Sequence, residues 1–338
     1  MEGRGSHRFL QVDEGIPGRG LFRAEDVVKM EGHSRGPHPS PWRGAMRPSK
    51  HSMQGRVCLV TGATSGIGKA LALRLAERGA TVVLVARNRE KGEAVRAELQ
   101  QRTGNPSIDL VLMDLSSTES IHQGVADFQR CYPRLHVLVN QAGLVQSQRT
   151  VTAEGLETMF ATNYLAYFTL TNLLLPQLKA AAPARILNVT GGIEAAGSID
   201  FDDLQGEQRF SWSRALAQSK LADVLFTYEL ARRLEGTGVT CNALNPGGVK
   251  TGLGKGAGGV PELFMKLGSL FFADAEKAAE RFVHPLVAPE LVQVSGCYFG
   301  PDGRTLAKSS ARSHDEAVAR RLWDVSTRLA RLPVARAA

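Results

Sequence analysis

The chain has 338 residues, of which 43% are hydrophobic and 22% are charged, and its formal net charge is +8. This composition is typical of a soluble globular protein, and the length allows one large domain or two small ones. The basic residues are scattered among Asp and Glu and rarely alternate with aromatic residues, so the charge does not indicate a nucleic-acid-binding face. The four cysteines form no Cys-x-x-Cys pair, so we expect neither a disulfide framework nor a metal site.

Residues 1–52 mix glycine, proline, histidine, serine and arginine without a sustained apolar period, and we expect this leader to be disordered or not part of the native protein. It has neither the apolar centre of a secretory signal nor the acid-poor composition of a transit peptide. Met46 or Met53 is an alternative start of the chain. Because no run of about 18 apolar residues occurs, the sequence predicts no transmembrane span. With cysteines expected to be reduced, the sequence favours a cytoplasmic protein.

Short apolar segments alternate with amphipathic segments along most of the chain. This alternation predicts an α/β fold, a single doubly wound (Rossmann-type) parallel sheet with helices on both faces. We expect the domain to span residues 53–332, with a short tail at 333–338. The expected strands are 56–60, 80–86, 108–113, 135–140, 184–189, 239–244 and 294–299, and the expected helices are 69–78, 91–101, 120–131, 156–178, 213–234 and 315–329.

A glycine-rich run lies between the first expected strand and the first expected helix. Gly62 permits a tight turn, Gly66 lets the backbone approach a pyrophosphate, and Gly68 allows the helix to pack closely on its strand. The free amide groups at the start of that helix then face an anion. The spacing G-x-x-x-G-x-G differs from the G-x-G-x-x-G fingerprint, so the position between strand and helix carries the prediction of a phosphate-binding loop.

Further motifs follow in a fixed order, and together they are very specific. They are Thr61-Gly62-x-x-x-Gly66-Ile67-Gly68, Asp114-Leu115, Asn140-x-Ala142-Gly143, Asn163, Ser219-Lys220-Leu221-Ala222 and Pro246-Gly247-x-Val249-x-Thr251. On these motifs the chain, from Gly55 to about Leu332, resembles the short-chain dehydrogenase/reductase family, nearest its retinol-dehydrogenase-like branch and the bacterial relatives of that branch. The resemblance implies a dinucleotide cofactor held by Gly62, Ser65, Gly66, Ile67, Gly68, Arg87, Asn88, Asp114, Leu115, Asn140, Ala142, Gly143, Lys220, Pro246, Gly247, Val249 and Thr251.

The residue after the second strand bears on the choice of cofactor. In the family an acid at this position grips the 2′-hydroxyl of NAD, whereas Arg87 suits the 2′-phosphate of NADP. Ser65 and Asn88 are placed to add neutral donors to that phosphate. We therefore expect a preference for NADP(H), with NAD(H) possible, although a solvated loop arginine is the alternative. Asp114 resembles the family's acceptor for the adenine amine, and a helix cap is the alternative role there.

The catalytic positions match the family only in part. The family uses Asn, Ser, Tyr and Lys, of which the tyrosine transfers the proton and the lysine lowers its pKa and holds the ribose. Asn163 and Lys220 match as catalytic residues. Leu216 occupies the tyrosine position, one helical turn before Lys220, and Gly191 occupies the serine position. Neither replacement has a hydroxyl group.

Two functions are compatible with this pattern. The first is an NADP-dependent oxidoreductase of a small apolar carbonyl or alcohol, with proton transfer through Tyr164, Tyr167 or a water molecule held by Asn163 and Lys220. The second is a non-catalytic nucleotide-binding sensor or scaffold, that is, a pseudoenzyme. Residues 252–272 resemble the variable lid of the family, whose apolar face suits a lipid-like or aromatic ligand, and an amphipathic surface helix is equally compatible. The sequence predicts no oligomeric state.

Overall fold

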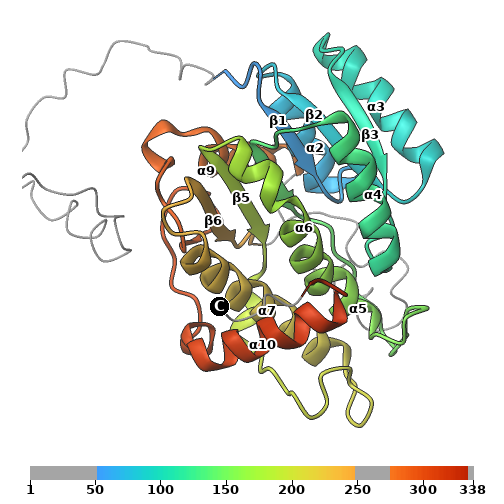
Figure 1. The fold of residues 1–338 in the computed structure, drawn as a ribbon, viewed down its shortest axis with the longest axis vertical. Coiled ribbons are helices and arrows are strands. Elements are labelled where there is room, and N and C mark those ends of the chain that lie inside the picture. Colours follow the sequence, from blue (N-terminus) through green and yellow to red (C-terminus); the bar gives the residue numbers. More distant parts are fainter. Residues whose placement is uncertain (1–51, 248–274, 334–338) are drawn as a thin grey trace, which may run out of the picture. The chain divides into compact units, whose positions relative to one another are not determined.

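The structure is a computed structural model that describes residues 52–247 and 275–333 (Figure 1). Its sheet has seven parallel strands in the order β3-β2-β1-β4-β5-β6-β7. The predicted α/β fold with one doubly wound parallel sheet is confirmed. The strands are β1 (Val57–Val60), β2 (Thr81–Ala86), β3 (Ile108–Leu112), β4 (Val137–Asn140), β5 (Ala184–Val189), β6 (Val239–Leu244) and β7 (Tyr298–Phe299).

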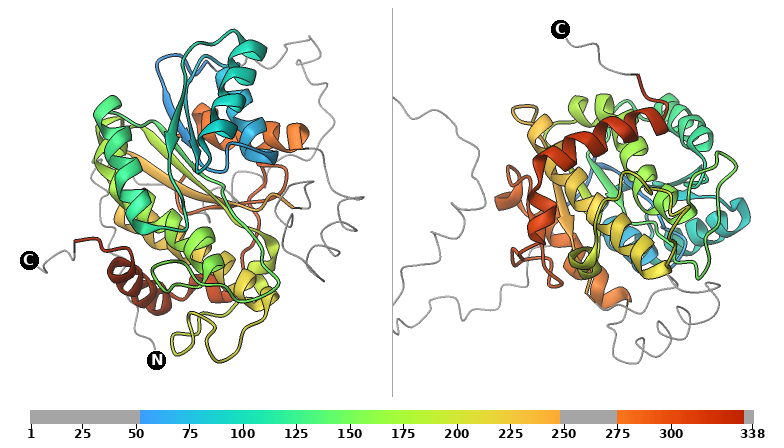
Figure 2. Two further views of the ribbon diagram at one scale, coloured as in Figure 1. Left: turned by 90° about the vertical axis from the view of Figure 1, so that its right-hand side faces the viewer. Right: turned by 90° about the horizontal axis from the view of Figure 1, so that it is seen from below.

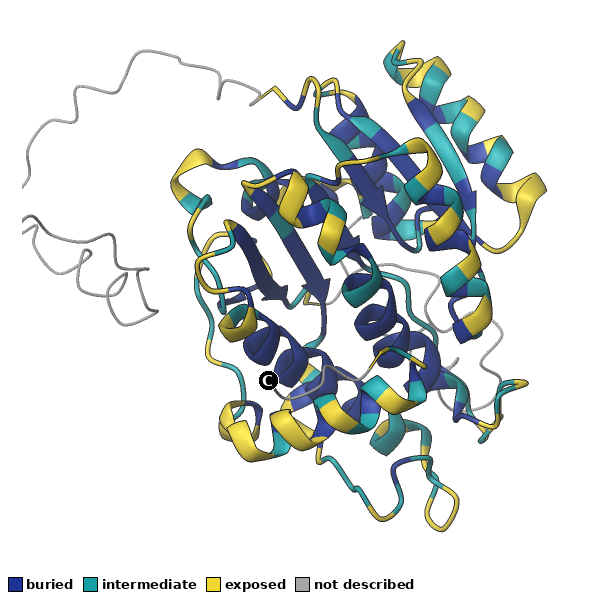
Figure 3. Ribbon diagram, viewed as in Figure 1, coloured by how far each residue is buried: buried dark blue, intermediate teal, exposed yellow. Residues whose placement is uncertain are grey.

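The central strands are buried on both faces, which explains their nearly continuous apolar sequences (Figure 3). Strand order reverses between β1 and β4, since the chain leaves β1 toward β2 and β3 and later returns to the other side. In doubly wound sheets the crevice at such a reversal, at the carboxyl ends of the strands, is the usual ligand site. We therefore expect the ligand site among the loops that follow β1, β2, β3 and β4.

Helices cover the sheet in two layers with separate apolar cores, and α10 adds a further helix against α7 (Figure 2). One core joins the sheet to α4, α6, α7 and α10, and the other joins it to α2, α3 and α9. The helices are α2 (Gly66–Ala76), α3 (Arg89–Thr103), α4 (Thr118–Cys131), α5 (Thr158–Phe160), α6 (Ala166–Ala180), α7 (Trp212–Arg233), α9 (Ala275–Val287) and α10 (Glu316–Leu329).

Three elements differ from the prediction. The single helix expected over 156–178 is divided into α5, a π-helical turn at Ala161–Leu165 and α6. The strand expected over 294–299 is reduced to β7, because Gly296 turns the backbone at a φ of 71°. Helix α9 was not predicted at all; its buried side chains, which include Phe282, pack against α2.

The ends of the chain fall largely outside the described residues. Of the expected leader only Ser52 is described, and of the expected tail only Pro333. Within the ranges that the structure describes, no helix is long and apolar enough to cross a membrane.

Candidate nucleotide-binding and catalytic site

The glycine-rich loop between β1 and α2 has the backbone that its sequence predicts. Gly62 and Gly66 have φ angles of 64° and 52°, which side-chain-bearing residues rarely adopt. A Cβ atom on Gly68 would lie 2.4 Å from the carbonyl oxygen of Gly62 and 2.2 Å from Oε1 of Gln141. Glycine is therefore required at position 68 by close packing, and at 62 and 66 by backbone conformation.

Thr61 ties this loop to the end of β4. Its Oγ1 accepts hydrogen bonds from the backbone amides of Gln141 at 2.8 Å and Ala142 at 3.0 Å. Ser65, the residue before α2, makes no capping hydrogen bond with its side chain and is exposed. The amide groups in the first turn of α2 thus keep their capacity to bind an anion.

A cleft of about 820 Å³ opens in front of this loop, a volume in the usual range for ligand sites. It brings together eight of the residues that the sequence assigned to the cofactor: Gly62, Ser65, Arg87, Asn88, Asp114, Leu115, Ala142 and Gly143. The other lining residues, which the sequence did not predict, are Thr64, Val85, Ala86, Glu90, Lys91, Ala94, Met113, Ser116, Leu144, Gln146, Thr158 and Thr162. Most of these flank the predicted residues in the same loops, so extending each motif by a few residues would have found them.

Arg87 lies at one end of the cleft, directly after β2. Its neighbour Asn88 caps α3, since Asn88 Oδ1 accepts a hydrogen bond from the amide of Lys91 at 2.8 Å. The Lys91 side chain lines the same cleft. Two cationic side chains therefore flank the start of α3, where the helix dipole also favours an anion.

Asp114 follows β3 at another edge of the cleft. Its Oδ1 accepts hydrogen bonds from the amide of Ser116 at 2.9 Å and from the Ser116 hydroxyl at 2.7 Å. Ser117, not Asp114, caps α4, because its Oγ accepts from the amide of Ser120 at 3.2 Å. The alternative role of Asp114 as the helix cap is therefore wrong.

Seven predicted cofactor residues within the described ranges do not line the cleft: Gly66, Ile67, Gly68, Asn140, Lys220, Pro246 and Gly247. Ile67 is buried in the apolar core, and Asn140 is buried beneath the cleft, where its Nδ2 donates to Thr171 Oγ1 at 2.9 Å and to Asn188 Oδ1 at 2.8 Å. Asn140 thus joins β4, β5 and α6. Pro246 and Gly247 follow β6, whereas Val249, Thr251 and the expected lid at 252–272 lie outside the described residues.

Asn163 is fully buried in the π-helical turn and fixes the segment that follows β4. Its Oδ1 accepts from the amide of Leu144 at 2.8 Å, and its Nδ2 donates to the carbonyl oxygen of Leu144 at 3.0 Å. The same Nδ2 lies 3.4 Å from Ser219 Oγ on α7. Single π-helical turns are frequent at functional sites, and this one places an amide between the cleft and α7.

Lys220 extends from α7 to the end of β5. Its Nζ donates to the carbonyl oxygen of Val189 at 3.1 Å and to Oδ2 of Asp223 at 2.9 Å. Burial raises the pKa of Asp223 to about 7, although the Lys220 ammonium opposes that shift. Asp223 was not among the predicted residues. A Lys and an Asp three residues apart on a helix usually form a solvated pair, so this spacing gives no signal of a buried pair.

The two tyrosines proposed as substitutes differ in position. Tyr164 points into the helical layer, where its hydroxyl lies 2.7 Å from Ser326 Oγ of α10. Tyr167 points to the strand ends, where its hydroxyl donates to the carbonyl oxygen of Ala142 at 2.8 Å, and its ring centre lies 5.4 Å from Lys220 Nζ. Burial raises the pKa of Tyr167 well above its usual value. Tyr167 therefore lies near the site and Tyr164 does not.

The surroundings of Leu216 and Gly191 are apolar or open. Leu216 is 8% exposed and belongs to an apolar cluster with Val145 and Met159. A Cβ atom on Gly191 would meet no atom within 4 Å. The nearby Thr190 hydroxyl donates to the carbonyl oxygen of Lys220 at 2.9 Å. Among the described residues, no side chain at these positions offers a proton donor in place of the family's tyrosine.

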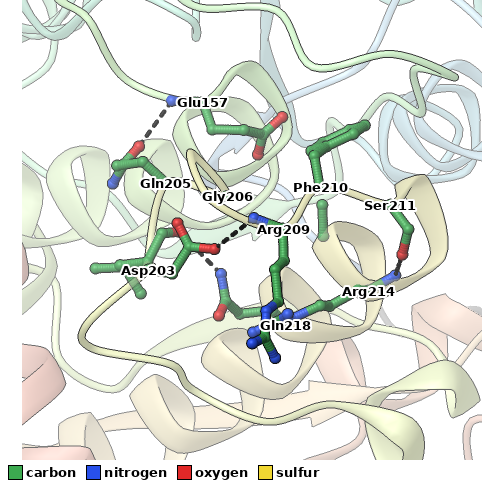
Figure 4. A pocket seen from close by; sticks show the side chains of 11 residues that line it. Glu157, Asp203, Gln205, Gly206, Arg209, Phe210, Ser211, Arg214 and Gln218 are labelled. Atoms are coloured by element: carbon green, nitrogen blue, oxygen red, sulfur yellow. Dashed lines mark hydrogen bonds between the residues drawn. The ribbon is translucent and has the colours of Figure 1, made fainter.

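A second hollow lies between the loop that contains Asp203 and the start of α7 (Figure 4). Asp203 accepts hydrogen bonds from the amides of Gln208 and Arg209, both at 3.0 Å, and the Gln205 side chain accepts from the amide of Glu157 at 2.7 Å. The volume of this hollow is about 10 Å³, which is close to the space of one water molecule. It is therefore part of the loop packing and not a ligand site.

Known proteins with similar sequences fit this geometry. The family model described as short chain dehydrogenase matches residues 56–258, which is more than half of the chain. The chain belongs to the short-chain dehydrogenase family. Within this family it is 43% identical over 292 residues to Retinol dehydrogenase 13 of Homo sapiens, covering 85% of this chain and 88% of the relative. It is 41% identical over 282 residues to Retinol dehydrogenase 11 of Homo sapiens, covering 83% of this chain and 88% of the relative.

Solved structures of other proteins share the fold. An uncharacterized protein from Mycobacterium paratuberculosis superposes with a TM-score of 0.67 at 30% identity, over 84% of this chain and 97% of that one. A short chain dehydrogenase from Shigella flexneri, solved in complex with NADP, superposes with a TM-score of 0.59 at 25% identity, over 75% of this chain and 99% of that one. The predicted family and its retinol-dehydrogenase-like branch are thus confirmed.

Proposed function

We propose that this short-chain dehydrogenase binds NADP(H) and transfers hydride between it and a small apolar alcohol or carbonyl compound, with atypical proton transfer. The observation that carries the proposal is the cleft at the strand reversal, which combines the glycine loop, the start of α2 and two cationic side chains, Arg87 and Lys91. A dinucleotide diphosphate suits the helix start, and a 2′-phosphate suits the cations. The names of the retinol dehydrogenases support an apolar alcohol or aldehyde as substrate.

When bound, the nicotinamide supplies the hydride. In our proposal the residues of the chain do the rest: Asn163 fixes the loop after β4, and Lys220 holds the ribose. The Leu216 cluster forms an apolar wall beside the reacting carbon. Without a hydroxyl at positions 191 and 216, the proton at the substrate oxygen comes from water, and slow turnover follows.

A non-catalytic nucleotide-binding protein is the second candidate. The observation that favours it is the apolar packing of Leu216, which leaves the proton path of the family without its donor. The two candidates agree on nucleotide binding and differ in turnover.

Calorimetric titration with NADPH and NADH, together with NADPH oxidation in the presence of retinal and other apolar aldehydes, tests the proposal. We expect tighter binding of NADPH and slow but measurable oxidation. Arg87→Asp should reverse the nucleotide preference, and Arg89→Asp, a neighbouring charge outside the cleft lining, is the matched control. Tighter binding of NADH by the unmodified chain would refute the NADP(H) preference, and binding without any turnover would favour the second candidate.

A further inference from the structure

Asp223 is a buried acid next to the catalytic lysine. Its side chain is 0% exposed, and its Oδ1 has no hydrogen-bond partner among the described residues. Its Oδ2 accepts from Lys220 Nζ at 2.9 Å. Burying a carboxylate costs several kcal/mol unless a partner and hydrogen bonds offset it. A buried carboxylate with one unpaired oxygen therefore lowers the stability of the fold. Its position beside Lys220 indicates a role in holding that side chain.

The surroundings of Lys220 leave its ammonium one free donor. Nζ has three N–H groups, of which one is directed to the carbonyl oxygen of Val189 and one to Asp223. The ring of Tyr167 covers another side at 5.4 Å from Nζ. These contacts hold the ammonium at the end of β5, just before Gly191, with one N–H available to an incoming hydroxyl group.

We propose that Asp223 is a positioning residue that fixes the Lys220 ammonium at the end of β5, and that ionisation of Asp223 makes nucleotide binding depend on pH. The inference rests on the proposed function, because it requires Lys220 to contact the bound nucleotide. Asp223 itself touches neither substrate nor cofactor and acts through Lys220.

The direction of the pH effect follows from the groups that face the pair. Lys220 and Asp223 project from α7, and Tyr164 and Tyr167 face them from the π-helical turn and α6. Burial raises the pKa of both phenols, so they stay neutral between pH 6 and pH 9. Burial raises the pKa of Asp223 to about 7. Above that pH the carboxylate is ionised and fixes the ammonium, whereas below it the ion pair is lost.

The test is a titration of NADH binding by nicotinamide fluorescence between pH 6 and pH 8.5. NADH is the probe because the 2′-phosphate of NADPH has its own pKa near 6. A hydrogen bond from a charged donor contributes about tenfold in affinity. Because a small fraction of Asp223 is already ionised at pH 6, the Kd of the unmodified chain should fall about fivefold from the low to the high end of this range. Asp223→Asn should keep the weaker, low-pH affinity throughout.

Two further variants separate positioning from folding. Glu229→Gln is the matched control: it lies on the same helix, and its carboxylate accepts from Arg232 and Arg233 at 2.7 Å, away from the cleft. It should follow the unmodified chain at every pH. Lys220→Met should abolish the pH dependence, and adding Asp223→Asn to it should change nothing more, because Asp223 acts through Lys220.

The outcomes distinguish this inference from the proposed function. If the affinity for NADH is the same at every pH, nucleotide binding stands but the role of Asp223 is refuted. An effect of Asp223→Asn that persists without Lys220 shows a structural role and also refutes it. If the chain binds neither nucleotide, both proposals fail. If Asp223→Asn does not fold, the comparison of the unmodified chain with Lys220→Met decides, since the transition near pH 7 must be present in the first and absent in the second.

Discussion

Restoring the two missing hydroxyl groups is the sharpest test of the proposed catalytic deficit. We expect Leu216→Tyr combined with Gly191→Ser to raise the rate of carbonyl reduction by about 10²–10⁴, the usual contribution of a general acid. At 1.36 kcal/mol for each factor of ten, this corresponds to about 3–5 kcal/mol of the activation barrier. The affinity for NADPH should stay within a few-fold, because neither position lines the cleft and neither is among the predicted cofactor residues.

The structure indicates that both substitutions can be accommodated. The backbone at Gly191 is extended, with φ −173° and ψ 151°, and a Cβ atom there meets nothing within 4 Å. Tyrosine at 216 would enlarge an apolar cluster that already includes Val145 and Met159, at a cost of about 1–3 kcal/mol in the free energy of unfolding. Leu216 is near the start of α7, and partly buried side chains such as Phe210 and Trp212 pack against its cluster. These side chains can move to make room for the larger ring.

The assay is NADPH oxidation with retinal and other apolar aldehydes under single-turnover conditions, with the melting temperature recorded in parallel. Leu216→Phe is the matched control, because it adds a ring of similar size without a proton donor. Leu216→Tyr alone should provide most of the gain, and Leu216→Phe should provide none. A double variant that folds and binds NADPH, but is as slow as Leu216→Phe, would refute the reasoning and favour the non-catalytic candidate.

Two other predictions concern residues that shape the site. Gly68→Ala should weaken NADPH binding at least tenfold and lower the melting temperature, because its new methyl group would lie 2.4 Å from the Gly62 carbonyl oxygen. Gly191→Ala is the control: its methyl group would meet no atom within 4 Å, so the melting temperature should not change. Asn163→Ala should lower the free energy of unfolding by about 1–3 kcal/mol for each Leu144 backbone group that it leaves unpaired, measured by urea denaturation, and Asn163→Asp should recover only the bond to the Leu144 amide.

The sequence predicted the fold well because each strand has a local signal. The bounds of β2, β5 and β6 agree with the predicted strands within one residue, since each mostly apolar run is followed by a polar residue, Arg87, Thr190 or Asn245. The expected strand at 294–299 was too long, because the turn at Gly296 depends on a left-handed backbone that an apolar pattern does not reveal. The phosphate loop was predictable because its glycines are required by the local backbone, through positive φ angles at Gly62 and Gly66 and close packing at Gly68.

The arrangement of the site was less predictable because it depends on which way each side chain points. Tyr164 and Tyr167 are three residues apart, yet one reaches α10 and the other reaches the strand ends. Tyr164 lies in the π-helical turn and Tyr167 in α6, so the helix type changes between them, which the sequence did not predict. Likewise, Lys220 and Asp223 have the spacing of a common surface pair, and their burial follows from the position of α7 between the sheet and α10. Such burial is a property of the fold and has no local sequence signal.

The contact between α10 and α7 gives a last prediction, which separates stability from the site. The Trp323 ring lies 4.9 Å from the ring of Phe168 and 4.0 Å from the Arg233 guanidinium. Trp323→Ala should lower the free energy of unfolding by about 2–3 kcal/mol, somewhat less than the loss for a fully buried tryptophan. The melting temperature should fall by about 5–10 °C. Arg320→Ala on the same helix, with a side chain 56% exposed, should change it by less than about 2 °C. Because no residue of α10 lines the cleft, the affinity for NADPH should be the same in both variants. If folded Trp323→Ala has lost NADPH binding, this prediction is wrong and α10 supports the nucleotide site.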